Sequence, residues 1–236
     1  MQYEPMTLKK PADVGPYHFW RRVLIAITAA SVFVFGGLAV FSLVGREHWS
    51  SLWNMGSHGL IALALVLLVV VQARSVSAIR ALVGNDVVRS LAVFVPLVLL
   101  AYLVCVGLEV GLGFPREDYM VNLFSGMSLP EQMLCIVMII VFPPISEELF
   151  FRHFLLRVFP LNHRVWKWVA VAVTAGLFMM IHSQYSNWPT LVLMGALGVL
   201  FALARIRTGG LAVPILMHSS AAVFGLSLNW IVGQWA

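Results

Sequence analysis

The sequence predicts an all-α polytopic membrane protein, a transmembrane helical bundle of about seven spans, with six to eight as the range. Apolar residues fill 61% of the 236 positions and charged residues only 11%. Charged residues make up about a quarter of an ordinary soluble domain, so a water-soluble fold of this size could not bury so much apolar surface. Several apolar runs also approach the length of about 20 residues that a helix needs to cross a hydrocarbon core.

Each apolar run is an expected span. The second and sixth runs are short, so one of them could be re-entrant, whereas the fourth is long enough for two segments. The fourth also contains Pro143-Pro144, which predicts a broken helix because proline removes a backbone donor. In chain order the runs are 21–44, 57–73, 88–111, 131–159, 166–183, 190–204 and 211–235.

The polar segments complete the expected organisation. Residues 1–20 contain three prolines among polar residues and are expected to form a cytoplasmic arm before a single transmembrane domain at 21–236. Residues 84–86 mark a loop, and residues 116–129 suit a short helix on the outer surface. The two cysteines, Cys105 and Cys135, lie inside apolar runs and lack metal-ligand spacing.

The placement of Lys and Arg predicts the orientation. If the N-terminus is cytoplasmic, thirteen of the fifteen Lys and Arg residues fall in inside loops or helix ends, and Arg46 and Arg116 fall outside. This positive-inside pattern predicts a cytoplasmic N-terminus and an external C-terminus, in what we expect to be a bacterial cytoplasmic membrane. It also accounts for the net charge of +5 without a nucleic-acid partner, because no basic stripe with interleaved aromatic residues is present.

Two adjacent carboxylates in the fourth run carry the strongest chemical signal. A charge at the centre of a span costs about 2.5 to 3.5 kcal/mol, so Glu147 and Glu148 need a compensating reason. Glu148 and Arg152 are four residues apart on one helix face, in the favourable order for an ion pair. Glu147 points about 100° away, which favours a role as general base. A structural role for both carboxylates, in an ion pair and in helix packing, is the alternative.

Two histidines on later spans are candidates for the same site. His182 ends the fifth run and His218 lies inside the seventh, where a polar side chain needs a partner. With Glu147 they could activate water or bind a divalent metal. As straight helices, the fifth and seventh spans would place the two histidines near opposite faces, so a shared site requires tilted, shortened or broken spans. His58 is expected at the interface, and Glu109 is expected to snorkel or to be a second functional carboxylate.

These residues resemble the motifs of the CPBP intramembrane proteases, which include the type II CAAX prenyl endopeptidases and bacteriocin-processing and self-immunity relatives. The first motif, two glutamates followed four positions later by arginine, is met by Glu147, Glu148 and Arg152. Phe178 and His182 meet the second motif. The third, His followed four residues later by Asn, is met only by His218, because Ala222 takes the Asn position. The resemblance covers about residues 131–235.

The resemblance implies hydrolysis of a peptide bond within the membrane, in a protein or peptide substrate that can be lipidated. Glu147 and His182 would activate water, His218 would stabilise the oxyanion, and Glu148 and Arg152 would hold the site together. We expect no cofactor and no metal. If the enzyme is metal-dependent, Glu147, His182 and His218 would be the zinc ligands.

Two other functions stay open at this point. Ala222 in the Asn position is compatible with a non-catalytic relative that serves as a membrane scaffold or immunity factor. Intramembrane Glu and His also build proton relays, so a proton-coupled transporter is a further alternative. Transporters usually show matching interruptions in two halves, and Pro143-Pro144 has no counterpart in the other half of the chain.

Overall fold

The structure, a computed structural model, describes residues 18–72 and 82–234, and these residues form helices without any strand. Seven of the helical segments in this part of the chain are long and apolar enough to cross a bilayer, which confirms the predicted fold class and count. The helices are α1 (Phe19–Val44), η1 (Arg46–His48), α2 (Ser51–Gln72), α4 (Val87–Leu112), α5 (Asp118–Val121), α6 (Leu129–Glu148), η2 (Leu149–Leu155), η3 (Leu156–Val158), α7 (Arg164–Ile181), α8 (Trp188–Thr208) and α9 (Ala212–Gly233). The second and sixth spans, expected to be short, have 22 and 21 residues.

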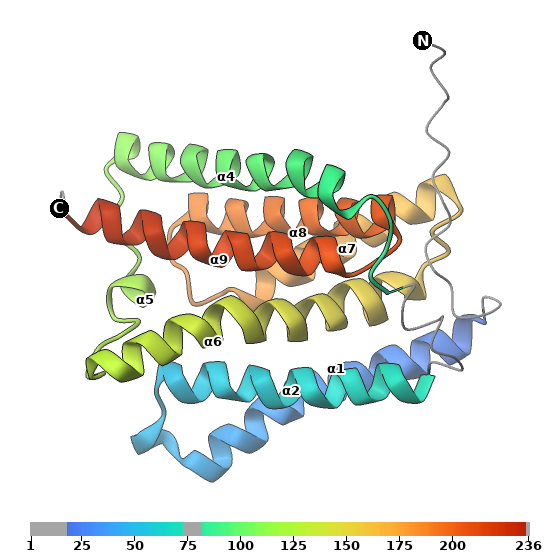
Figure 1. The fold of residues 1–236 in the computed structure, drawn as a ribbon, viewed down its shortest axis with the longest axis horizontal. Helices are drawn as coiled ribbons and strands as arrows, with labels where there is room; N and C mark the ends of the chain where they lie inside the picture. Colours follow the sequence, from blue (N-terminus) through green and yellow to red (C-terminus); the bar gives the residue numbers. More distant parts are fainter. Residues whose placement is uncertain (1–17, 73–81, 235–236) are drawn as a thin grey trace.

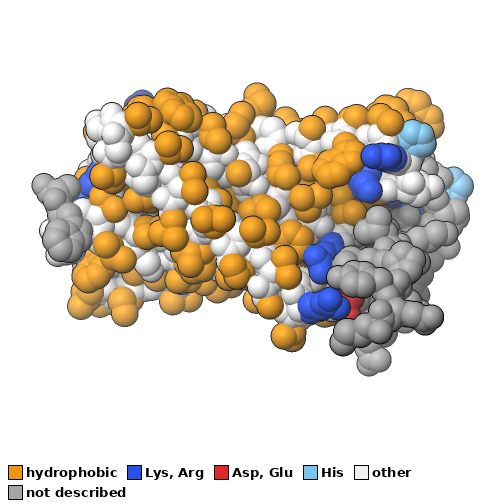
Figure 2. All heavy atoms as spheres, turned by 90° about the horizontal axis from the view of Figure 1, so that it is seen from above, with side chains coloured by type: hydrophobic (Ala, Val, Ile, Leu, Met, Phe, Trp, Pro, Cys, Tyr) orange, Lys and Arg blue, Asp and Glu red, His pale blue; other side chains and the backbone are white. Residues whose placement is uncertain are grey.

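The long helices lie side by side in layers. Figure 1 shows α4 along one edge, α8 and α9 next to it, α6 in the middle, and α1 and α2 along the opposite edge. The helix contacts agree, because α6 packs between α2 and α9 while α4 covers both α8 and α9. More than half of the residues of α8 are buried, including Phe201, so α8 is a central helix of the core. Figure 2 shows hydrophobic side chains along the length of one face, as expected for a surface that contacts lipid.

The fourth span is one long segment whose irregular part lies after the proline pair. α6 runs through Pro143-Pro144 without interruption, and a π-helical turn follows at Leu149–Leu155. Pro144 has no N–H to give to the carbonyl of Ile140, and the hydroxyl of Ser219 on α9 donates to that carbonyl at 2.8 Å. Of the two expected forms of this span, broken or long, the structure shows the long one, because a neighbouring helix satisfies the freed carbonyl.

The basic residues of the described segments gather mainly at one end of the bundle. α1 and α7 begin at this end and α8 finishes there, whereas α9 finishes at the opposite end (Figure 1). The side of the membrane that this end faces stays a prediction, and Lys9, Lys10, Arg74, Arg80 and Trp235 lie outside the described residues. The sequence analysis placed Arg152 and Arg205 in inside loops or helix ends, and this was wrong because both side chains are buried.

Candidate active site

The ion pair that the sequence predicts on α6 and η2 is present and buried. The Nε atom of Arg152 lies 3.2 Å from Oε2 of Glu148, and both side chains have no exposed surface. A second guanidinium nitrogen of Arg152 donates to the carbonyl of Gly198 at 2.9 Å. The guanidinium carbon also lies 4.8 Å from the centre of the Phe178 ring and 5.4 Å from that of Phe201. The buried charge is thus compensated by a carboxylate, a carbonyl and aromatic faces.

His218 of α9 binds to the same carboxylate. Its Nδ1 atom lies 3.0 Å from Oε1 of Glu148, and its Nε2 atom lies 4.0 Å from Oε2 of Glu147. The imidazole stacks on the ring of Phe201, with centroids 5.0 Å apart. A carboxylate bound to one ring nitrogen fixes the orientation of the imidazole and so the direction in which the other nitrogen points. Glu148 therefore has two partners, Arg152 and His218, where the sequence predicted only the first.

His182 is held by Phe178, the first residue of the same motif. The Nδ1 atom of His182 lies 2.8 Å from the carbonyl oxygen of Phe178, and a carbonyl can only accept, so Nδ1 carries the proton. In a neutral imidazole, Nε2 is then left as an acceptor. The ring of Phe178 lies between His182, at 4.6 Å, and the guanidinium of Arg152. This aromatic side chain thus connects the histidine to the buried ion pair.

One cavity of about 370 Å³ brings the predicted site residues together. It is lined by Glu147, His182 and His218, with Phe178 and Ala222 in its wall. The shared site is possible because α7 is the shortest of the seven spans, at 18 residues or about 27 Å, and ends beside the cavity at Ile181. The structure thus meets the geometric requirement for a shared site, while the catalytic roles of these residues stay predictions.

His58 is a further residue of this site, although the sequence analysis placed it at the membrane interface. Its Nδ1 atom lies 2.8 Å from Oγ of Ser146 and 4.0 Å from Oε1 of Glu147. The assignment was wrong because α2 begins at Ser51, which puts His58 two turns inside the helix and against α6. A signal was present: Asn54 and His58 are four residues apart, so they share one helix face, and both line the cavity.

Glu109 lies outside this cavity and does not snorkel. Its Oε1 atom accepts hydrogen bonds from the hydroxyl of Thr190 at 2.6 Å and from the side-chain amide of Asn187 at 3.1 Å. Glu117, in the segment expected on the outer surface, is also buried and accepts the backbone N–H groups of Ser186 and Asn187. Both carboxylates join the connection after α4 to the loop before α8.

The described residues contain no cluster already arranged as a metal site, so the zinc ligand set of Glu147, His182 and His218 stays an alternative. Zinc holds nitrogen and oxygen ligands at about 2.0 to 2.2 Å. Within residues 18–72 and 82–234, no group of three or more His, Cys, Asp or Glu side chains is arranged to hold a metal ion. His218 Nδ1 is bound to Glu148, and its Nε2 atom is 4.0 Å from Glu147. The metal-free site stays a prediction, and no step proposed below uses a metal.

Comparison with known proteins identifies the region that carries these motifs. Residues 129–227, less than half of the chain, match the family model of the type II CAAX prenyl endopeptidase Rce1-like proteins. These residues are similar to the Rce1-like proteins. The match runs from the start of α6 into α9 and includes Glu147, His182 and His218. The resemblance inferred from the motifs is confirmed, and the match supports a membrane-embedded protease.

A relative from Escherichia coli is known as an uncharacterized 24.3 kDa protein. It is 37% identical to this chain over 115 residues, which cover 49% of this chain and 53% of the relative. The chain thus spans about half the length of this curated relative. No solved structure matches the chain. His58 lies outside the matched residues 129–227, so the family match alone does not include every residue that lines the cavity.

Proposed function

We propose that the chain is a glutamate-dependent intramembrane endopeptidase that hydrolyses a peptide bond in a membrane-associated or lipidated protein. The observation that carries the proposal is the environment of Glu147. Its side chain is 7% exposed, and its Oε2 atom has no hydrogen-bond donor among the described residues although it is buried beside the cavity. A buried carboxylate oxygen needs a donor, and a water molecule in the cavity supplies one.

Water activation follows from the two acceptors that face the cavity. Glu147 accepts one hydrogen of the water, and Nε2 of His182 accepts the other, because Nδ1 donates to Phe178. Glu147 takes a proton as the water oxygen bonds to the carbonyl carbon of the substrate. The same carboxylic acid then returns a proton to the amide nitrogen as the C–N bond breaks, which releases an amine and a carboxylic acid and leaves Glu147 as a carboxylate again.

Stabilisation of the oxyanion falls to His218. With both ring nitrogens protonated, Nδ1 donates to Glu148 and Nε2 is free to donate to the oxyanion. Arg152 holds Glu148 from the other side and so fixes the imidazole. Ala222 supplies no donor, although it lies one turn further along α9 and lines the cavity. The proposed oxyanion site therefore has fewer side-chain donors than the resembled motif provides.

The helices around the cavity define the substrate class. The site lies among spans whose outer surfaces are apolar, so a substrate reaches it from the bilayer or from its surface. Membrane lipid and a protein or peptide substrate are the proposed partners. We propose a bacterial cytoplasmic membrane with the N-terminus inside, on the basis of the Lys and Arg placement.

The test compares membranes that carry the native chain, Glu147→Ala or Glu47→Gln. Glu47 is an exposed carboxylate in η1 and serves as the control. We expect membrane proteins whose cleaved ends appear with the native chain and the control, and are missing with Glu147→Ala. A purified native chain should then cut the same proteins. Identical cleaved ends in all three membranes would contradict the proposal.

A non-catalytic scaffold is the second candidate, and Ala222 is the observation that favours it. In that case the Glu147→Ala chain would retain its binding partners as well as its fold, and no cleaved ends would depend on Glu147. Capture of partners by native and Glu147→Ala chains, run beside the cleavage comparison, separates the two functions.

A further inference from the structure

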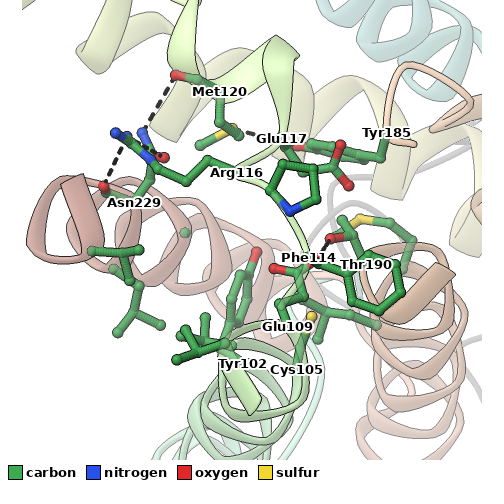
Figure 3. Close-up of a pocket in the computed structure, with 18 residues that line it drawn as sticks. Tyr102, Cys105, Glu109, Phe114, Arg116, Glu117, Met120, Tyr185, Thr190 and Asn229 are labelled. Carbon is green, nitrogen blue, oxygen red and sulfur yellow. Dashed lines mark hydrogen bonds between the residues drawn. The ribbon is translucent and has the colours of Figure 1, made fainter. Parts of the chain in front are cut away.

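A second pocket of about 130 Å³ adjoins the catalytic cavity (Figure 3). It lies between α4, α8 and α9, and the connection from Phe114 to Met120 closes it. Its lining combines three charged side chains, Glu109, Arg116 and Glu117, with aliphatic side chains from α4, α8 and α9. These aliphatic residues are Val106, Val110, Leu193, Leu228 and Val232.

The pocket and the catalytic cavity share a wall. The residues that line both are Tyr102, Met120, Tyr185, Met194 and Gly225. Tyr185 forms the link to the catalytic residues, because its ring is parallel to that of His182 with centroids 6.3 Å apart. Its hydroxyl lies 3.8 Å from the sulfur of Met120. The ring of Tyr185 therefore lies between His182 and this pocket.

The three charged side chains of the lining are bound to polar groups of neighbouring segments, which leaves the aliphatic part of the pocket for an apolar group. Glu117 accepts the backbone N–H groups of Ser186 and Asn187. Glu109 accepts from Thr190, and Arg116 donates to both the side-chain and the backbone oxygen of Asn229, at 3.0 and 3.2 Å. Figure 3 shows Arg116 turned toward Asn229, and Glu109 next to Thr190. The interior thus suits an apolar group.

The volume limits the size of that group. An apolar cavity of about 150 Å³ accepts one benzene molecule, so about 130 Å³ fits one aromatic ring or one branched aliphatic side chain. The pocket shares five lining residues with the catalytic cavity, so a side chain in it belongs to a part of the substrate near the scissile bond. We propose that this pocket is a specificity subsite for one large apolar side chain of the substrate. This inference rests on the proposed protease function.

Gly225 lies in the wall that the two spaces share. A Cβ atom at this position would lie 3.2 Å from the hydroxyl oxygen of Tyr102 and 3.3 Å from a carbon of its ring. Gly225→Ala therefore presses on Tyr102 and changes the shape of the shared wall. Gly107 offers a matched control, because a Cβ atom there meets nothing within 4 Å and both glycines lie inside long helices. The gain in helix propensity is similar for the two substitutions.

The first experiment measures side-chain preference. The purified full chain in detergent micelles is given N-palmitoylated peptides that vary near the cleaved bond, and products are identified by mass spectrometry. We expect Phe or Leu to be favoured over Ala at one position by about ten-fold or more. Gly225→Ala should remove most of this preference, and Gly107→Ala should keep it. Leu228→Ala, which widens the pocket, should improve cleavage of Trp peptides.

Equal preferences in the native chain and Gly225→Ala, together with no change in Leu228→Ala, would overturn the subsite. Leu228→Ala decides the question if Gly225→Ala does not fold, because Leu228 lines the pocket and not the catalytic cavity.

A second experiment does not depend on cleavage. Cys105 lines the pocket, and Cys135→Ala leaves it as the single thiol of the chain. In a Cys135→Ala, Glu147→Gln protein, Phe peptides should slow alkylation of Cys105 by N-ethylmaleimide, and Ala peptides should not. If the native chain cleaves no peptide, the proposed protease function fails. Slower alkylation of Cys105 in the presence of Phe peptides would still show whether the pocket binds a large apolar side chain. Protection by added phospholipid alone, with no effect of any peptide, would identify a lipid site and overturn the inference.

Discussion

Glu148 joins two elements that are far apart in sequence, because Nδ1 of His218 lies 3.0 Å from its Oε1 atom while Arg152 Nε lies 3.2 Å from its Oε2 atom. The second glutamate of the pair thus orients a candidate catalytic histidine as well as compensating a buried cation. Glu147, one residue earlier, is left to face the cavity. This division of roles between adjacent carboxylates has separate consequences for activity and for stability.

Glu147→Gln and His182→Ala should each abolish detectable cleavage and leave the melting temperature close to that of the native chain. Each removes a proposed acceptor of the water, and a general base contributes about 10² to 10⁴ in rate. Peptide cleavage and thermal unfolding in the same micelles are the measurements. Full activity of Glu147→Gln would exclude it as the base.

Arg152→Ala should act mainly on stability. It leaves Glu148 without its cation in a fully buried position, and breaking such a pair costs about 3 to 5 kcal/mol. Chemical denaturation of the micelle-bound protein measures the change in the free energy of unfolding. Arg89→Ala, at an exposed residue of α4, is the control and should change little. Similar stabilities for the two variants would show that the buried pair is not needed for folding.

His58→Ala should slow cleavage by about ten-fold, less than the 10² to 10⁴ that a general base itself contributes, because His58 acts through Glu147. The imidazole contacts Ser146 and faces Glu147, so its loss frees the turn that presents the carboxylate. His58→Gln keeps a hydrogen-bonding side chain and should recover part of the rate. His48→Ala, at an exposed residue, controls for loss of a histidine. Native rates in His58→Ala would show that cleavage does not need this residue, which lies outside the matched residues 129–227.

Ala222→Asn should raise the cleavage rate at least several-fold. An oxyanion donor typically contributes about 10² to 10³ in rate, and the two polar neighbours on α9 have other partners. Ser219 donates to the carbonyl of Ile140, and Asn229 accepts from Arg116. Ala222→Leu controls for added volume and should not raise the rate. An unchanged rate in Ala222→Asn would mean that another group already donates to the oxyanion.

Chelators should leave cleavage intact, because the proposed base and the oxyanion donor are side chains of the chain itself. Treatment with a strong zinc chelator, followed by metal analysis and a cleavage assay, is the measurement. Stoichiometric zinc in the purified protein that leaves together with activity would reverse the prediction.

The sequence by itself determined the properties that depend on neighbours within a few residues. The length and apolar character of each run identify seven spans, because the bilayer thickness sets the length of a helix that crosses it. Helical periodicity places Glu148 and Arg152 on one face, and the ion pair follows from that spacing alone. The type and order of Glu147, His182 and His218 identified the candidate site for the same local reason.

The tertiary structure decided which faces of separate helices meet. His58 reaches Ser146 across 88 residues of chain, and the hydroxyl of Ser219 on α9 lets α6 continue through Pro144. Hydropathy shows that a residue is polar but not which neighbouring helix provides its hydrogen-bond partner. For this reason His58 was expected at the interface, and the helix was expected to break at Pro143-Pro144. Such pairings depend on how side chains on one helix fill the spaces of the next, which is a property of the packed bundle and not of any local pattern.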